Sequence, residues 1–185
     1  MDKKRKSTRG FTLVEILVAI TIFSITVAGT FSAVASSLAY ARHVRLQTTA
    51  RWLAHEGLEI IRNARERYPS AWYSTGSKDP LSECIGTWCA VEIQPNQTPG
   101  LEFSECGRGG PGNSEFNCPP LLFNQNETTS DFLYNYSNGS ETFFRRALKI
   151  KPIAPGEEYK VISKVMWGAN SEFSMESTLH VYQRI

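Results

Sequence analysis

Apolar residues dominate the first part of the chain. Residues 11–40 contain mainly Ile, Val, Ala, Leu and Phe with Ser and Thr, no proline, and a single charge at Glu15. At a rise of about 1.5 Å per residue, a helix of this length extends about 45 Å, more than the roughly 30 Å of a bilayer hydrocarbon core. The pattern therefore predicts a helix that can cross a membrane.

Helical periodicity continues after residue 40, but on one side only. Apolar or small residues recur there at steps of four and three, at Leu46, Ala50, Leu53, Gly57, Ile60 and Ala64. The other side is charged, and it places Glu59–Arg62 and Arg62–Glu66 at spacings that allow ion pairs. Residues 41–68 are thus predicted to form an amphipathic half-helix whose apolar stripe packs against other structure.

Tyr68-Pro69 marks the expected end of this helix, because the residue before a proline disfavours helical backbone. We therefore predict one continuous helix from about Phe11 to Arg67. Such a helix is too long to pack within one small domain.

The rest of the chain consists of two regions that differ in composition and in hydrophobic pattern. Residues 69–142 are rich in Asn, Gly, Pro, Ser and Thr, which predicts a loop-rich region with one strand near Trp88–Ile93. Residues 143–185 contain three alternating segments, FFRRALKIKPI, EYKVISKVMWG and SMESTLHVYQRI, joined by short turns. Short connections favour an antiparallel meander, which would cover the apolar stripe of the helix. The predicted fold class is α+β.

All four cysteines, Cys84, Cys89, Cys106 and Cys118, follow the apolar helix. This placement fits a domain exported to an oxidising compartment, and the absence of a C-x-x-C pair argues against a zinc ribbon. Of the three possible connectivities, we favour Cys84–Cys89 with Cys106–Cys118, because both close short loops. Each bond would contribute roughly 2 to 3 kcal/mol in the loop-entropy model. Free buried thiols are the alternative.

Charge is concentrated at the N-terminus. The first ten residues, MDKKRKSTRG, carry five basic side chains and one acidic, a balance of +4 in a chain whose net charge is +2. The remaining residues therefore sum to −2, which is not the basic surface that a nucleic-acid-binding protein needs. The basic segment instead predicts that the N-terminus stays in the cytoplasm.

The basic leader, Gly10, the sequence FTLVE and the long apolar run resemble the class III signal of bacterial type IV pilins and pseudopilins. The resemblance covers residues 1 to about 35, and the later helix and terminal meander are similar to minor pilins and minor pseudopilins. It implies cleavage after Gly10 by a prepilin peptidase, N-methylation of Phe11, and an assembly role for Glu15. Residues 1–10 would then be a cleaved cytoplasmic leader and residues 11–40 the transmembrane and assembly helix.

The resemblance also implies partners and a location. The expected partners are other pilin or pseudopilin subunits through the N-terminal helix, the peptidase, and an assembly platform in the inner membrane. The chain would be stored in that membrane with its C-terminal domain exported, and then enter a filament. Independently of any family, a carboxylate in apolar surroundings needs a partner, and the freed Phe11 ammonium is one helical turn from Glu15.

Several alternatives remain open at this stage. Glu15 could merely reach the membrane surface as part of an ordinary signal anchor. Ala33-Val34-Ala35 could serve an ordinary signal peptidase, giving a mature N-terminus at Ser36, although the apolar run is longer than such signals use. The helix could also deliver a binding module, whose Gly/Asn/aromatic segment around residues 100–140 would contact a surface, a glycan or DNA.

Catalytic, metal and cofactor sites are not expected. No hydrolase, zinc-protease, P-loop or dinucleotide motif occurs, so a membrane-tethered enzyme is the least favoured reading. His55 and Glu59 are one helical turn apart, but a solvated ion pair is the simpler interpretation. Four Asn-x-Ser/Thr sequences begin at Asn96, Asn126, Asn135 and Asn138, and we interpret them as loop polarity. Burial beneath loops is expected for the aromatic residues Trp72, Tyr73, Trp88, Tyr134 and Tyr136.

Overall fold

The computed structural model describes residues 12–67, 81–93, 100–107, 116–124, 134–154, 157–168 and 170–180. It divides into two compact units, Met1–Arg45 and Leu46–Ile185. We call the second unit the head. Each unit is described by itself below.

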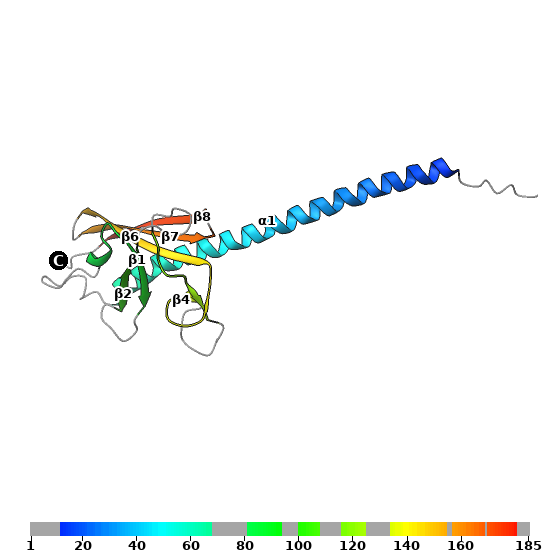
Figure 1. Cartoon of the computed structure of the whole chain (residues 1–185). Coiled ribbons are helices and arrows are strands. Elements are labelled where there is room, and N and C mark those ends of the chain that lie inside the picture. The colour runs from blue at the N-terminus through cyan, green and yellow to red at the C-terminus, as the bar shows by residue number, and fades with distance from the viewer. Residues whose placement is uncertain are drawn as a thin grey trace, which may run out of the picture. The chain divides into compact units, whose positions relative to one another are not determined.

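Helix α1 extends from Leu13 to Arg67 and contributes to both units (Figure 1). No proline interrupts it, and the basic residues Arg65 and Arg67 in its last turn interact favourably with the negative end of the helix dipole. The predicted single helix is therefore confirmed. In the head, the side of α1 that packs inward consists of Ala50, Leu53, Ala54, Gly57, Leu58, Ile60, Ile61 and Ala64. The predicted stripe is confirmed, with Leu46 half-buried at its start.

The main sheet of the head has five antiparallel strands in the order β2-β1-β6-β7-β8. Their bounds are β1 Trp88–Ile93, β2 Leu101–Glu105, β6 Phe144–Ala154, β7 Glu158–Trp167 and β8 Ser171–His180. The predicted strand at Trp88–Ile93 and the meander of the last third are confirmed. Strand β8 begins at Ser171, three residues before the predicted segment, because it pairs with β7 as far as Trp167.

The middle of the chain contains more sheet than predicted. Strand β2 pairs with β1 and extends the main sheet, although its sequence LEFSE gave no strand signal. A second, three-stranded sheet has the order β4-β3-β5, with β3 Leu122–Phe123, β4 Tyr134–Asn135 and β5 Ser140–Glu141. The short helix η1 covers Ser82–Cys84. The loop-rich middle is confirmed, and among the described residues it contains more short strands than predicted.

The core of the head has a layer on each face of the main sheet. The stripe of α1 packs on one face, against residues that include Leu148, Val161 and Val165. The opposite face is covered by a smaller cluster formed by Ala90, Cys106, Phe116, Cys118, Ala147 and Met166. Strand β7 is therefore buried on both faces along much of its length, whereas its sequence predicted one buried face.

Both favoured disulfides are present, Cys84–Cys89 and Cys106–Cys118. The first links η1 to β1 and belongs to the cluster beneath α1. The second joins the end of β2 to the segment before β3 and belongs to the cluster on the opposite face. Each disulfide therefore fastens a non-repetitive segment to one face of the sheet.

Candidate functional site

The candidate site begins at the first turn of α1. Gly10 and Phe11 lie outside the described residues. Thr12 precedes the helix, and the backbone N–H of Glu15 donates to the Thr12 carbonyl oxygen at 3.1 Å and to its Oγ1 at 3.3 Å. Thr12 thus caps the helix and occupies one of the donors that every helix start leaves unsatisfied. This cap places Glu15 in the first turn, where the positive end of the helix dipole favours a carboxylate.

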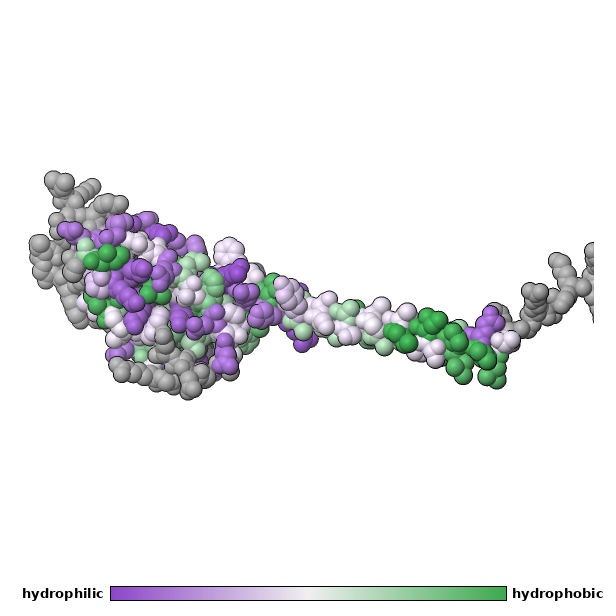
Figure 2. Space-filling model, turned by 90° about the horizontal axis from the view of Figure 1, so that it is seen from above, coloured by the Kyte–Doolittle hydropathy of each residue, from purple (hydrophilic) through white to green (hydrophobic). Residues whose placement is uncertain are grey.

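The surface of α1 beyond Glu15 is apolar and exposed. From Leu13 to Tyr40, the exposed large side chains are Leu13, Val14, Ile16, Leu17, Val18, Ile20, Ile22, Phe23, Ile25, Val27, Phe31, Val34, Leu38 and Tyr40. By length and composition α1 can cross a membrane. Figure 2 shows these apolar side chains gathered on the N-terminal part of the helix. Exposure on this scale is typical of a surface that contacts lipid or other protein.

Six hydroxyl groups within this surface donate to carbonyl oxygens of the same helix. Thr21 donates to the Val18 carbonyl at 2.8 Å, and Ser24 donates to that of Ile20 at 2.8 Å. Equivalent bonds are made by Thr26, Thr30, Ser36 and Ser37. A hydroxyl that is already bonded within its helix can enter hydrocarbon or a helix bundle without losing a partner. Glu15 is then the one side chain of residues 12–41 whose charge needs compensation.

The head contains a buried ion pair that the sequence did not predict. Arg146 on β6 is 2% exposed, and its Nη1 donates to Glu56 Oε2 of α1 at 2.9 Å. The same nitrogen lies 3.4 Å from the Leu53 carbonyl oxygen. The helical period places Glu56 on the charged side of α1, but its side chain is only 27% exposed. It lies at the border of the stripe, so its carboxylate turns inward to a strand residue distant in sequence.

Two tyrosines complete this cluster. The hydroxyl of Tyr136 donates to the Arg146 carbonyl oxygen at 2.9 Å, and the Arg146 guanidinium lies 6.0 Å from the centre of the Tyr136 ring. Burial raises the pKa of Glu56, and the charge and hydrogen bond of Arg146 offset part of that rise. Burial also raises the pKa of Tyr134 and of Tyr136, and the nearby Glu56 carboxylate adds to both shifts. The cluster therefore fastens α1 to the sheet. The raised pKa values keep both tyrosine hydroxyls protonated at neutral pH.

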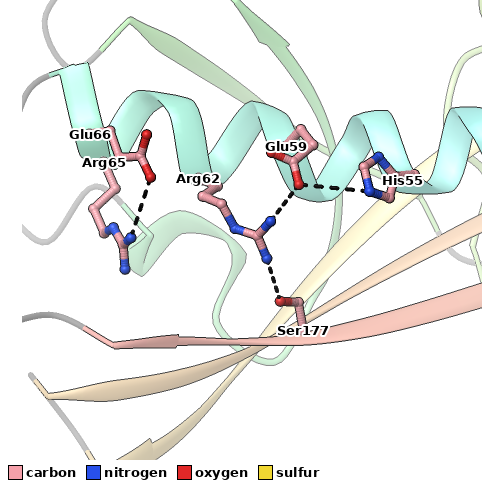
Figure 3. A network of polar contacts seen from close by, with 6 residues as sticks. All are labelled: His55, Glu59, Arg62, Arg65, Glu66 and Ser177. Carbon is pink, nitrogen blue, oxygen red and sulfur yellow. Dashed lines mark hydrogen bonds and ion pairs between the residues drawn. The ribbon is translucent and has the colours of Figure 1, made fainter.

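Further along α1, a polar network lies at the surface (Figure 3). His55 Nε2 is 3.8 Å from Glu59 Oε1, and Arg62 bonds both Glu59 and the Ser177 hydroxyl of β8. The predicted solvated pair of His55 with Glu59 and the Glu59–Arg62 pair are confirmed. Across the described residues, no group of three or more potential metal ligands is found.

The prediction of an ion pair between Arg62 and Glu66 is wrong. Arg62 turns toward β8, and Glu66 instead lies 3.8 Å from Arg65.

Of the four Asn-x-Ser/Thr sequences, two begin at described residues, Asn135 and Asn138. Asn135 is 8% exposed, and its Oδ1 accepts from the backbone N–H groups of Ser137 at 3.0 Å and Asn138 at 2.7 Å, so it shapes a turn. Asn138 is exposed, and Asn96 and Asn126 lie outside the described residues.

The aromatic candidates that are described pack beneath neighbouring structure. Trp88, Tyr134 and Tyr136 are half-buried, and the rings of Trp88 and Phe116 lie 5.1 Å apart. Trp72 and Tyr73 lie outside the described residues.

A helix that is apolar in its first part and packs on an antiparallel sheet in its second part defines a pilin-like fold. Residues 5–31 match the family model described as the prokaryotic N-terminal methylation motif. The chain is therefore a type IV pilin-like precursor with a prepilin-type signal for processing and methylation. Such a signal implies processing by a prepilin peptidase and assembly with other pilins. No curated protein and no solved structure matches the chain.

The match includes Gly10, Phe11 and Glu15, and it ends within the apolar part of α1. It does not extend to the sheet. An inner-membrane anchor is consistent with both the motif and the apolar helix.

Proposed function

We propose that the chain is a structural subunit, a minor pilin or pseudopilin, of a type IV pilus or type II secretion filament. One observation carries the proposal: within the matched motif, Glu15 is the single charge on an otherwise apolar and exposed helix surface. A subunit stored in the inner membrane and later packed among helices of its own kind needs this arrangement. The role requires no catalytic step from the chain.

The proposed assembly step depends on charge pairing. Cleavage after Gly10 creates an ammonium group on Phe11, four residues before Glu15, and methylation of that nitrogen retains its charge. In the membrane, Glu15 is near enough to the surface to reach water or headgroups. In a bundle of helices that route is closed, and an unpaired carboxylate would cost several kcal/mol. Pairing with the Phe11 ammonium of a neighbour removes this cost, so processing and assembly are linked.

The test compares Glu15→Ala with a matched control, Glu59→Ala, which removes an exposed carboxylate from the head part of the same helix. We expect both variants to insert into the inner membrane. Glu15→Ala leaves the Phe11 ammonium of the neighbouring helix without its partner in the bundle. The ratio of filament-incorporated to membrane-held chain should therefore fall at least tenfold for Glu15→Ala, equivalent to about 1.4 kcal/mol, and stay unchanged for Glu59→Ala. Normal incorporation of Glu15→Ala would refute the pairing role.

Mass spectrometry of the mature N-terminus provides an independent check. The proposal requires an N-methylated Phe11 as the first residue. A chain that begins at Ser36 would have been cut by an ordinary signal peptidase and would lack both charged partners.

A further inference from the structure

The segment between β4 and β5 contains the one Asn-Gly sequence of the chain, Asn138-Gly139. Asn138 is exposed, and within the described residues its side-chain amide makes no hydrogen bond. Asn135, the last residue of β4, is only 8% exposed, and its Oδ1 accepts from the backbone N–H groups of Ser137 and Asn138. The amide of Asn135 is therefore held in place, whereas the amide of Asn138 is free to turn.

The fold requires a glycine after Asn138. Gly139 has a φ of +131°, a backbone conformation that favours glycine. A Cβ built on Gly139 would overlap the Phe123 carbonyl group of β3 and lie 3.0 Å from the Asn124 backbone nitrogen. No larger residue can therefore stand at this position and shield its own backbone nitrogen from the Asn138 side chain.

An asparagine followed by glycine can react with its own main chain. The Gly139 backbone nitrogen attacks Asn138 Cγ, the bond from Cγ to the side-chain nitrogen breaks, and ammonia leaves with the proton that the Gly139 nitrogen loses. Both groups belong to adjacent residues, so the step is intramolecular and forms a cyclic imide. Water then opens the imide, and no oxidant or reductant takes part.

The imide opens to two products. If water breaks the bond from nitrogen to the former side-chain carbon, an ordinary aspartate results at position 138. If water breaks the other carbon–nitrogen bond, the main chain continues through Cβ and Cγ and is one carbon longer. Both products replace a neutral amide by a carboxylate, three residues before the exposed Glu141 of β5.

The longer chain cannot be accommodated equally on both sides of position 138. On the N-terminal side the segment is fastened, because Asn135 binds its backbone and the Ser137 hydroxyl donates to Glu92 Oε1 of β1 at 2.6 Å. On the C-terminal side Gly139 lies directly against β3, and the next residues form β5. Strand β5 pairs with β3 through two residues only, Ser140 with Phe123 and Glu141 with Leu122.

We propose that Asn138 is a site of spontaneous deamidation, and that the β-linked product loosens β5 from β3. This inference goes beyond the proposed function and does not depend on it. Deamidation makes the surface at β5 more acidic as the chain ages. The five-stranded sheet is unaffected, because none of its strands contains or adjoins position 138.

Peptide mass spectrometry of the full chain in detergent tests the reaction. The chain is kept in water enriched in heavy oxygen at neutral and at mildly alkaline pH, and the same chain unfolded in urea is the positive control. We expect heavy oxygen to enter at Asn138 in the folded chain, faster at the higher pH because base removes the Gly139 N–H proton. Conversion at Asn135 should be slower by about tenfold or more. An Asn138 that stays intact while the unfolded control converts would overturn the proposal, as would equal rates at Asn135 and Asn138.

Variants separate the effect of chain length from that of charge. Asn138→Gln should abolish the conversion, because its longer side chain does not close the same ring. Freshly prepared Asn138→Asp adds the charge without the additional carbon. We expect hydrogen exchange at Leu122 and Phe123 to be faster in the chromatographically separated β-linked chain, and unchanged in Asn138→Asp and along β7. Unchanged exchange in the β-linked chain would refute the loosening of β5, and persistent conversion of the same peptide in Asn138→Gln would refute the site.

Discussion

The ion pair between Arg146 and Glu56 gives the sharpest prediction about the stability of the head. Arg146 is 2% exposed and Glu56 is 27% exposed, so the two partners differ in their access to water. Glu56→Ala removes the acceptor at 2.9 Å and leaves the guanidinium buried with one long contact, 3.4 Å, to the Leu53 carbonyl oxygen. The Arg146 Nε has no hydrogen-bond partner even in the wild type.

The expected cost follows from this asymmetry. Removing one partner of a buried ion pair destabilises a protein by about 3 to 5 kcal/mol. We expect the lower end, about 3 kcal/mol, because the Leu53 carbonyl remains and alanine favours the helix. With a urea dependence of about 2 kcal/mol per molar, the midpoint of unfolding should fall by about 1.5 M.

Urea unfolding of the detergent-solubilised full chain measures this shift. The near-ultraviolet circular dichroism of the buried Trp167 reports on the head. The matched control is Glu59→Ala, whose exposed ion pair with Arg62 should be worth less than about 1 kcal/mol.

A double variant identifies the cause. In Glu56→Ala/Arg146→Met the buried charge is gone and an apolar side chain fills much of its space, so most of the stability should return. The reasoning would be refuted if Glu56→Ala were no more destabilising than Glu59→Ala. It would also be refuted if the double variant were as unstable as Glu56→Ala.

Two further predictions concern the same contact between helix and sheet. Gly57→Ala should destabilise the head by about 1 to 3 kcal/mol in urea unfolding, despite the better helix propensity of alanine, because its Cβ would lie 2.6 Å from the Ser163 Oγ. Adding Ser163→Ala should restore part of the loss, and a neutral or stabilising Gly57→Ala would contradict the close approach. The second prediction concerns pH: because burial raises the pKa of Glu56 above 4.5, the native state binds more protons than the unfolded state above that pH. Glu56 therefore contributes its full stabilisation of the native state below about pH 4.5. That stabilisation is lost as the pH rises through the raised pKa of Glu56. Unfolding midpoints across this interval should show the loss in wild type and not in Glu56→Ala.

Features set by neighbouring residues could be predicted from the sequence. The single helix α1 follows from uninterrupted helix-compatible residues and from the cap at Thr12. The stripe beginning at Leu46 follows from the helical period, and the strands β6 to β8 follow from alternation and turn residues. The two disulfides were favoured because both close short loops. Glu15 was identified because a lone charge in an apolar run is visible without any coordinates.

Other features depend on residues that meet only after folding. Strand β2 has no strand pattern of its own, and its pairing with β1 stabilises it. Strand β7 is buried on both faces because Phe116 and the Cys106–Cys118 disulfide cover the side away from α1.

The sequence by itself determined the helix, its exposed apolar part and the lone charge at its start, because these depend on composition and on spacing within one segment. Tertiary structure decided that Glu56 turns inward to Arg146 and that Gly57 allows the sheet to approach. The physical reason is that burial and charge pairing are properties of packed surfaces. A helical period gives the direction of a side chain, but only the opposing strand determines what that side chain meets.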